Sequence, residues 1–393
     1  MRVLIIGAGV AGLSCAVALR RTGPVELTIL ERGSEVAAQG GTGIAIPPNG
    51  ARALAAVGVA VERLIAQGSL LREYCMLDAS GRELSRADLT QLWLGEELPY
   101  FAVHRRRIYE ALLEALGDQR IDFGSTAEVG PDALAGDHPA SVRITGPMGM
   151  RVGTFDLIIG ADGIRSALRQ VVFPAAAPRK LGWWTWRCVL DYERPVFQTQ
   201  VVYSGRGGVF LYLPLASKQV YVYAGCRDIE GRMRQESGHG TALAARFGGF
   251  AVPRALLDAI SALPDQAFHV GWLEEIPHEQ MTAAGRGRAL LVGDALHACS
   301  PNMAQGVSLA AEDGVVLADL VRTSAEGSIP DRFWQRRLPR IRHVQELTRK
   351  RDHLVNKRAE SALFQWVSNR VIRWRGLDRM QRDAFAYLLE NPA

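Results

Sequence analysis

The N-terminal segment joins a short apolar run, a glycine-rich turn and a helical pattern, which is the order of an α/β fold. Val3–Ile6 is continuously apolar, as expected for a strand covered on both faces. Leu13–Arg21 has apolar residues at helical spacing, and Thr22–Pro24 should end this helix. Val25–Leu30 predicts a second strand. The chain therefore starts with a strand, turn, helix and strand.

Comparable elements recur far along the chain. Phe155–Ile159 and Ala289–Val292 predict two more buried strands, and a long helix is expected over about Ser308–Arg322. Between them, residues 181–228 alternate apolar and polar positions and are rich in aromatic side chains, which predicts a sheet. From Gly40 to Gly58 a glycine-rich stretch leads into a helix, and further helices are expected at His104–Leu116 and beyond Asp331.

Composition adds mainly exclusions. The 393 residues are 48% hydrophobic and 22% charged, which is ordinary for a globular protein. Five cysteines without CxxC or zinc spacing predict neither a disulfide framework nor a metal site. The apolar runs are too short for a leader or a membrane span, so we expect a cytoplasmic protein without an integral membrane segment. Net charge is +5, but scattered arginines do not predict nucleic-acid binding.

The C-terminal helical region is basic and leaves two alternatives open. Its charges could form a solvated face packed on the body of the protein, which we favour, or could contact nucleic acid or a membrane surface. Its apolar residues could pack on the body or form a dimer surface, so a monomer or a homodimer is expected. The basic residues are Arg340, Arg342, Arg349, Lys350, Arg351, Lys357 and Arg358, and the apolar ones are Trp366, Val367, Val371, Ile372 and Trp374.

The turn after the first strand is a GxGxxG motif at Gly7, Gly9 and Gly12. In such motifs the first glycine makes the tight turn, the second lets the backbone approach a pyrophosphate, and the third allows close helix–strand packing. The start of the next helix offers free N–H groups to phosphates. Glu31, at the end of the second strand, can accept hydrogen bonds from ribose hydroxyls. These features together predict a dinucleotide site.

Two later segments carry a family resemblance. Asp156–Ser166 contains Gly160-Ala-Asp-Gly163, and Leu290–Pro301 contains Gly293-Asp294. With the glycine turn, they resemble the fingerprints of the class A FAD-dependent aromatic monooxygenases, the family of para-hydroxybenzoate, salicylate and urate hydroxylases. The resemblance implies a Rossmann-like FAD-binding domain of the GR2 type with an inserted β-sheet substrate domain and C-terminal helices. The implied bounds are 1–70, 100–172 and 275–330 for the FAD-binding domain, 71–99 and 173–274 for the substrate domain, and 331–393 for the helices.

The resemblance also implies the cofactor contacts. Asp294 would hold the ribitol or ribose region, although a helix N-cap is the alternative role. Asp162 would lie at the flavin edge, with an ion pair to Arg165 or a structural cap as its alternatives. Arg105 matches a flavin-contacting arginine of the family. The expected cofactor-binding residues are Gly7, Gly9, Ala11, Gly12, Glu31, Arg32, Ala45, Arg105, Ala127, Asp162, Asp294, Pro301, Ala304, Gln305, Gly306, Val307 and Ser308.

The loop Pro301–Ser308 should feed the long helix and turn backbone N–H groups toward the flavin pyrimidine, where negative charge grows on reduction. This loop departs from the family pattern at Ala304, where the usual loop has glycine. The first turn departs similarly at Ala11, where many members have glycine.

Candidate residues for the substrate side come from the inserted sheet and the GD segment. Tyr221 matches an active-site tyrosine of the urate-hydroxylase-like members, and His297 lies close to the implied flavin. Both are candidate catalytic residues, although a structural role is the favoured alternative for His297. Val209 and Asn302 stand where those members have an arginine and an acid, which argues against urate as the substrate. For any one of the aromatic residues of the sheet, packing in its core is favoured over contact with a substrate.

The expected activity is therefore that of a single-component hydroxylase. FAD would be reduced by NADH or NADPH, and O₂ would give a flavin C4a-hydroperoxide that hydroxylates a small aromatic or heteroaromatic molecule. No metal is expected. The alternatives are a halogenase or reductase on the same fold, or a flavin-binding module without catalysis. The faint tryptophan pair Trp184-Thr-Trp186 is the only halogenase-like feature, and a lysine at the place those enzymes use is missing.

Overall fold

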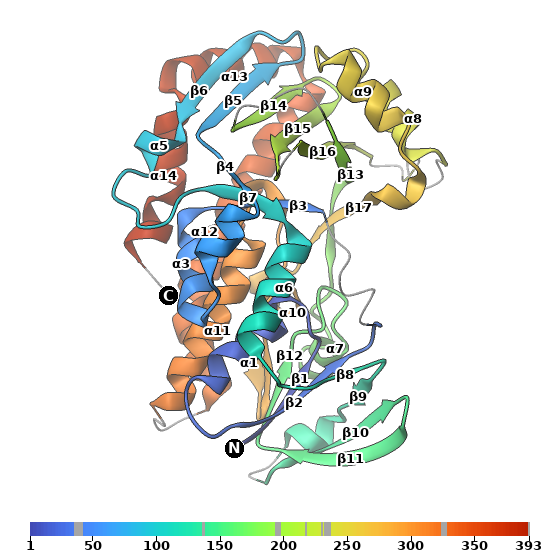
Figure 1. Ribbon diagram of the computed structural model, residues 1–393, viewed down its shortest axis with the longest axis vertical. Coiled ribbons are helices and arrows are strands. Elements are labelled where there is room, and N and C mark those ends of the chain that lie inside the picture. Colours follow the sequence, from blue (N-terminus) through green and yellow to red (C-terminus); the bar gives the residue numbers. More distant parts are fainter. Residues whose placement is uncertain are drawn as a thin grey trace.

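The computed structural model describes residues 1–34, 42–135, 138–192, 198–216, 218–228, 231, 237–323 and 328–391. Gly40 and Gly41 of the glycine-rich stretch lie outside these residues. Two large sheets occupy opposite ends of the molecule, and the long helix α12 (Ile329–Glu360) reaches both of them (Figure 1).

The first sheet has the strand order β18-β19-β12-β1-β2-β8. All its neighbouring strands run parallel except β18, which pairs antiparallel with β19. The strands are β1 (Arg2–Ile6), β2 (Glu26–Glu31), β8 (Ile121–Phe123), β12 (Leu157–Gly160), β18 (Gly285–Arg286) and β19 (Ala289–Leu291). The expected strand over Phe155–Ile159 is thus two elements, because Phe155 ends a different strand and β12 begins at Leu157.

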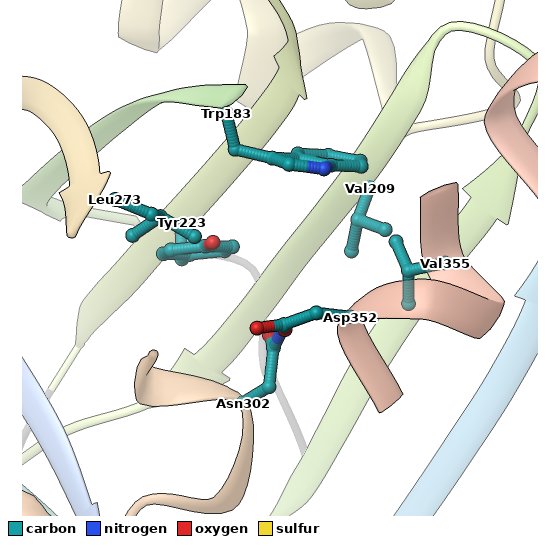
Figure 2. A pocket seen from close by; sticks show the side chains of 7 residues that line it. All are labelled: Trp183, Val209, Tyr223, Leu273, Asn302, Asp352 and Val355. Carbon is teal, nitrogen blue, oxygen red and sulfur yellow. The ribbon is translucent and has the colours of Figure 1, made fainter. Parts of the chain in front are cut away.

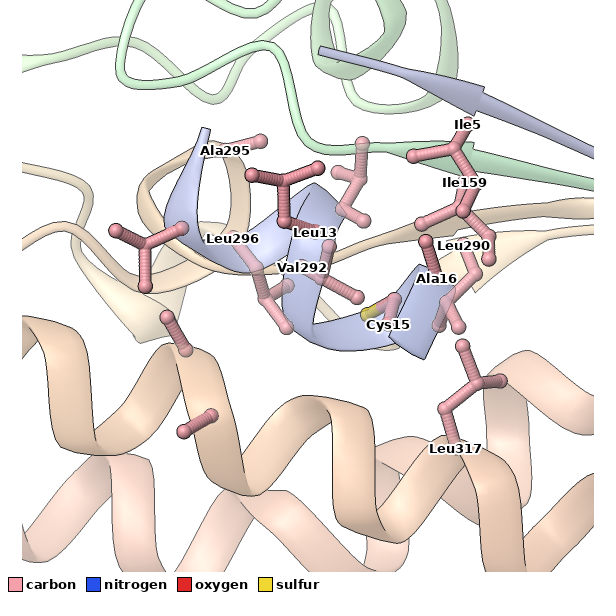
Figure 3. Packing of buried hydrophobic residues seen from close by; sticks show 14 of the residues in the cluster. Ile5, Leu13, Cys15, Ala16, Ile159, Leu290, Val292, Ala295, Leu296 and Leu317 are labelled. Carbon is pink, nitrogen blue, oxygen red and sulfur yellow. The ribbon is translucent and has the colours of Figure 1, made fainter. Parts of the chain in front are cut away.

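The helix after the glycine turn, α1 (Val10–Arg20), lies between this sheet and α11 (Gly306–Arg322), as Figure 3 shows. Leu13 and Ala16 of α1, Ile159 of β12 and Leu317 of α11 are all buried in this layer. A Cβ atom on Gly314 of α11 would come within 2.7 Å of the carbonyl oxygen of Ser14. The two helices therefore approach each other closely through their backbones, which anchors α1 against α11.

Smaller elements surround this sheet. Its helices are α3 (Pro48–Val57), α4 (Val61–Ala66), α6 (Arg105–Leu116), α7 (Ala167–Val172) and α10 (Asp294–His297). One small sheet contains β3 (Gly43–Ile46), β7 (Phe101–His104) and β4 (Ser69–Leu70), and another contains β9 (Thr126–Glu128), β10 (Ala140–Gly146) and β11 (Gly149–Phe155). Among the described residues, short 3₁₀ turns are η1 (Pro131–Leu134), η3 (Asp265–Ala267), η4 (His278–Gln280) and η5 (Pro301–Met303).

The second large sheet has the order β17-β13-β16-β15-β14-β5-β6. Its strands are β5 (Glu73–Asp78), β6 (Glu83–Asp88), β13 (Arg179–Asp191), β14 (Thr199–Gly205), β15 (Gly208–Pro214), β16 (Gln219–Arg227) and β17 (Phe268–Glu275). One face packs against α8 (His239–Phe247) and α9 (Arg254–Ser261) and buries Trp184, Trp186 and Phe210. These three aromatic residues therefore form core, while α12 crosses strands of the same sheet.

Helices α5 (Leu89–Leu92), α12, α13 (Ala362–Arg375) and α14 (Leu377–Glu390) complete the chain. This architecture confirms the predicted fold class. The favoured view of α12 as a solvated basic face is wrong for much of its charge. Arg340 and Arg358 are buried, and Arg349 pairs with Glu275 at 3.1 Å. Buried carboxylates and carbonyl groups, which sequence cannot locate, draw these side chains inward.

Candidate active site

The glycine turn has the packing that its motif predicts. Gly7 has φ +104°, and a Cβ on Gly7 or Gly12 would collide with the carbonyl oxygen of Ala161 or of Gly7. A Cβ on Gly9, in contrast, would meet no atom within 4 Å. The first and third glycines are therefore required by close packing, whereas the second faces space that a pyrophosphate could enter.

Glu31 joins the end of β2 to the glycine turn. Its Oε2 atom accepts a hydrogen bond from the Ala8 N–H at 2.9 Å, and its Oε1 atom accepts one from Gly33 at 2.8 Å. Arg32 beside it is exposed. The structure thus brings an acidic side chain to the start of α1, as the spacing predicted.

A groove of about 600 Å³ opens at the carboxyl end of β1. Ile6, Ala127 and Asp162 are among its lining residues. Ligands in sheets of this kind lie beyond the carboxyl ends of the strands, and this volume suits part of a dinucleotide. Ala127 and Asp162, which are far apart in sequence, are therefore brought to one cavity.

Asp162 has one occupied and one free oxygen. Its Oδ2 atom accepts from the N–H groups of Ala167 at 2.7 Å and Leu168 at 3.3 Å, which caps α7. Its Oδ1 atom is buried and has no hydrogen-bond partner among the described residues. Arg165 pairs instead with Glu274 at 2.9 Å. The cap is one of the predicted alternative roles of Asp162. The other alternative, an ion pair with Arg165, is not formed among the described residues. The free oxygen suits a polar ligand.

The GD segment lies directly after β19. Gly293, with φ +57°, occupies the N-cap position of α10, so Asp294 is the first helical residue and not the cap. A Cβ on Gly293 would lie 2.5 Å from the Ala11 side chain, which shows how closely the GD segment and the first turn pack. Asp294 itself is exposed. Its position fits a carboxylate that binds a sugar hydroxyl.

Replacing Asp294 by alanine is expected to lower retention of FAD, because the variant loses a hydrogen-bond acceptor while the exposed site needs no repacking. The ratio of flavin absorbance to protein absorbance after gel filtration measures this retention. Asp258→Ala is a matched control, since Asp258 is an exposed aspartate of α9 whose pair with Arg254 is also exposed. Equal flavin content in both variants would refute the assignment.

His297 is buried with Asp313, and its Nε2 atom lies 2.7 Å from Asp313 Oδ2. Asp313 also accepts a hydrogen bond from Arg337 at 2.8 Å and one from the Gly293 N–H at 2.8 Å. Burial alone would raise the pKa of Asp313, but the charges of His297 and Arg337 lower it. This enclosed network favours the structural role of His297, and a catalytic role stays a prediction.

The loop before α11 is held in place by a pair of side-chain amides. The amides of Asn49 and Gln305 pair reciprocally, at 2.9 and 3.3 Å. Ala304 has φ +52°, a left-handed conformation that glycine adopts without strain, so the departure from the family pattern falls on a residue with a conformational cost. Gly306, where α11 begins, is exposed, whereas Ser308 lies against Gly50.

The start of α11 has free backbone donors. The first intrahelical donor in this turn is Leu309, which bonds to Gln305, so the N–H groups of Gly306 and Val307 have no helical acceptor. Pro301 in η5 is exposed, and the Arg105 N–H at the start of α6 donates to the Thr42 carbonyl at 2.8 Å. Ala45 lies in β3, opposite Ala102. The helix start therefore presents its positive end to a ligand.

A small cavity of about 10 Å³ lies between the second large sheet and α12 (Figure 2). This space holds about one water molecule. Val209 and Asn302, the two positions that argue against urate, both line it. The complete lining is Trp183, Val209, Tyr223, Leu273, Asn302, Asp352 and Val355. It is mostly apolar and aromatic, with two polar side chains.

Tyr221 does not line this cavity, although Tyr223 does. Tyr221 packs against Gly43, and burial raises its pKa to about 12, with Thr42 as a hydrogen-bond partner. Its hydroxyl group is therefore neutral near pH 7. A catalytic role of Tyr221 remains a prediction.

Asp352 of α12 is the cavity residue that sequence reasoning missed. One of its carboxylate oxygens, Oδ1, accepts from the Ser300 hydroxyl at 3.0 Å and from the Asn302 amide. Its Oδ2 atom is buried without a hydrogen-bond partner among the described residues. Burial raises the pKa of Asp352 to about 6, against the lowering effect of those two hydrogen bonds. No motif marks this residue, but it follows the buried Gln345 by seven positions, which is a helical spacing.

No helix in the described part of the chain is long and apolar enough to span a membrane.

Comparisons with known proteins bear on the family of this chain. A family model described as an FAD binding domain matches residues 1–348. The chain is 30% identical to an aurachin C monooxygenase/isomerase of Stigmatella aurantiaca, over 97% of this chain and 96% of that protein. It is also 30% identical to a 2-heptyl-3-hydroxy-4(1H)-quinolone synthase of Pseudomonas aeruginosa, over 95% and 94%.

The fold is similar to that of Klebsiella pneumoniae HpxO, solved with FAD and uric acid. The TM-score is 0.85 at 24% identity, over all of this chain and 97% of that one. The predicted family is therefore confirmed, and with it the cofactor class. The chain belongs to the FAD-binding-domain family, among the FAD-dependent aromatic monooxygenases that its motifs resemble.

Proposed function

We propose that this FAD-dependent monooxygenase hydroxylates an uncharged heteroaromatic ring that carries an N–H group, at a site beside Asp352 where the small cavity must widen to admit the ring. NADH or NADPH would supply the electrons and O₂ the oxygen atom. When bound, FAD supplies the redox and oxygen chemistry, and the protein orients the ring, excludes water and handles protons. We also propose that the enzyme acts in the cytoplasm, as a monomer or homodimer.

The candidate cofactor site supports binding of FAD across both halves of the first domain. The groove at β1 would hold part of the dinucleotide, with Asp162 at the flavin edge and Glu31 at the start of α1 near a ribose. Asp294 would bind the sugar region, and the N–H groups of Gly306 and Val307 would favour negative charge on the flavin pyrimidine. Asp294 is exposed, and Asp162 Oδ1 has no hydrogen-bond partner among the described residues. Glu31 differs, because each of its oxygens already accepts a backbone N–H group.

The cavity supports a neutral ring as substrate. Its lining is mostly apolar and aromatic and includes no arginine or lysine side chain, which favours an uncharged ring over an anion. Its ionisable carboxylate is Asp352, which is an acceptor when ionised. A relative named for a 4(1H)-quinolone product is consistent with a ring of this class.

The observation that carries the proposal is the free Oδ2 atom of Asp352. A ring N–H group would donate a hydrogen bond to this oxygen. As oxygen adds to a ring carbon, positive charge develops on the nitrogen, and Asp352 can take the N–H proton. When the C–H proton leaves to solvent and aromaticity returns, Asp352 can give its proton back to nitrogen. The pKa of about 6 leaves the carboxylate ionised at pH 7 yet basic enough for this exchange.

The test uses purified holoprotein with 2-heptyl-4(1H)-quinolone, its N-methyl derivative and urate as probes. The N–H quinolone should stimulate oxygen-dependent NAD(P)H oxidation and yield a product heavier by one oxygen atom. The N-methyl ring and urate should stimulate it far less. Halide-dependent product, or oxidation of NAD(P)H without any oxygenated product for all three probes, would contradict the proposal.

A further inference from the structure

Helix α13 carries its hydrophobic residues on the wrong side for a helix that packs on a protein body. Its large apolar residues recur at helical spacing, yet they point to solvent. Trp366 is 53% exposed and Trp374 is 84% exposed. The complete stripe is Leu363, Trp366, Val367, Val371 and Trp374. Exposed apolar patches of this kind mark interaction sites. Of the two predicted alternatives for these residues, packing on the body applies only to Ile372, which is buried.

The opposite side of α13 is mostly polar and is joined to the rest of the protein through Ser368. Ser368 accepts a hydrogen bond from Arg358 and donates one to the Gln365 carbonyl at 3.0 Å. Ile372 is the buried residue of this helix, which packs beside β6 (Figure 1). α13 is therefore attached to the rest of the protein through its polar side, and its apolar stripe stays exposed to solvent.

The charge on α13 indicates what covers the stripe. The helix sequence, ALFQWVSNRVIRWR, contains three arginines and no acidic residue. The Arg370 guanidinium lies 3.9 Å from the centre of the Trp366 ring, so cation and indole form one surface. Arg373 is also exposed. Tryptophan with arginine on an exposed helix is typical of the interface between water and an anionic lipid layer.

We propose that α13 attaches the enzyme to the surface of an anionic membrane, with its apolar stripe in the headgroup region and its arginines at lipid phosphates. A second copy of the chain fits less well. A two-fold interface would bring the same positively charged helix against itself, without acidic residues on α13 to compensate. This attachment is independent of the proposed substrate.

The test is cosedimentation of the holoprotein with vesicles of phosphatidylcholine alone and with about one-third phosphatidylglycerol. Binding should require the anionic lipid and weaken with added salt. Trp366→Ser/Trp374→Ser and Arg370→Glu/Arg373→Glu should each weaken binding by about tenfold or more. Leu94→Ser/Met148→Ser and Arg286→Glu are matched controls on exposed positions elsewhere, and both should bind like the wild type.

Quenching by brominated lipids gives a second readout. Tryptophan fluorescence should be quenched in the wild type and not in the double tryptophan variant, whose flavin content and circular dichroism should match the wild type. Two outcomes would overturn the proposal. One is an absence of vesicle binding, or binding that the variants retain. The other is a dimer in light scattering that the tryptophan variant dissociates, which would assign the stripe to self-association.

Discussion

Replacing Asp352 by asparagine is expected to lower kcat/KM by about 10²–10⁴-fold, the usual contribution of a positioned acid–base group. Asparagine keeps the size of the side chain and can still face Ser300 and Asn302, but it cannot take a proton. The measurement is coupled NAD(P)H oxidation with product detection, using 2-heptyl-4(1H)-quinolone. Glu346→Gln, on an exposed position of the same helix, is the control and should keep full activity.

The pH dependence separates this role from a structural one. In the wild type, kcat/KM should rise with pH through about 6, as Asp352 ionises, and then level off. The asparagine variant should lack this step. The groups that face Asp352 are Glu275, which raises its pKa, and Arg351, which lowers it, with the Cys299 thiol and the Tyr223 hydroxyl also near.

The contribution of Asp352 to the free energy of unfolding should fall as pH rises, whereas kcat/KM should rise. The folded pKa of Asp352, about 6, lies above its ordinary value of 3.8, so the folded state holds this proton more tightly than the unfolded state. Its contribution to stability is therefore present at low pH and is lost as pH rises between these values. The asparagine variant should lack that loss. Full activity in a flavin-replete asparagine variant would refute the role of Asp352, whereas inactivity of the wild type toward the quinolone would refute the proposed substrate.

Replacing Arg337 by methionine is expected to lower the free energy of unfolding by about 3–5 kcal/mol, because it leaves buried carboxylates without their partner. Arg337 donates to Asp313 at 2.8 Å, to Glu312 at 2.9 Å and to the Leu309 carbonyl at 3.0 Å. Urea unfolding followed by circular dichroism measures the change.

The neighbouring residue provides the control for this variant. Arg336 pairs with Asp319 on the surface, and Arg336→Met should cost less than about 1 kcal/mol. If both variants lost equally little stability, the buried network would not support the fold as described. Because Asp313 also holds His297 and the Gly293 N–H, the Arg337 variant should lose flavin as well.

Much of the cofactor half could be predicted from sequence. The glycine turn, Glu31 and the GD segment are local patterns whose backbone requirements recur wherever a dinucleotide meets a parallel sheet. Gly7 and Gly12 are glycines because a Cβ would collide, and Gly9 because the space beside it stays open. Such constraints act on single residues, so they can be recognised in the sequence.

The residues on the substrate side of the site could be predicted from sequence only in part. Val209 and Asn302 were singled out by position, and they do line one cavity, but Tyr223 rather than Tyr221 joins them there. Asp352 lies far along the chain on a basic helix, and its importance depends on burial and on partners from another segment. The burial of charge in the basic tail could not be predicted for the same reason, because Arg337 and Arg340 pair with Glu312 only when α12 packs on α11.

By itself, the sequence determined the fold class, the cofactor class and the family, because short-range patterns of glycine, apolar and acidic residues specify strand, turn and helix directly. Tertiary structure alone decided which carboxylate stands in the cavity, which arginines are buried and which face of α13 is left uncovered. Each of these depends on the free energy of burying charged or apolar groups against partners distant in sequence, and no local pattern contains that information.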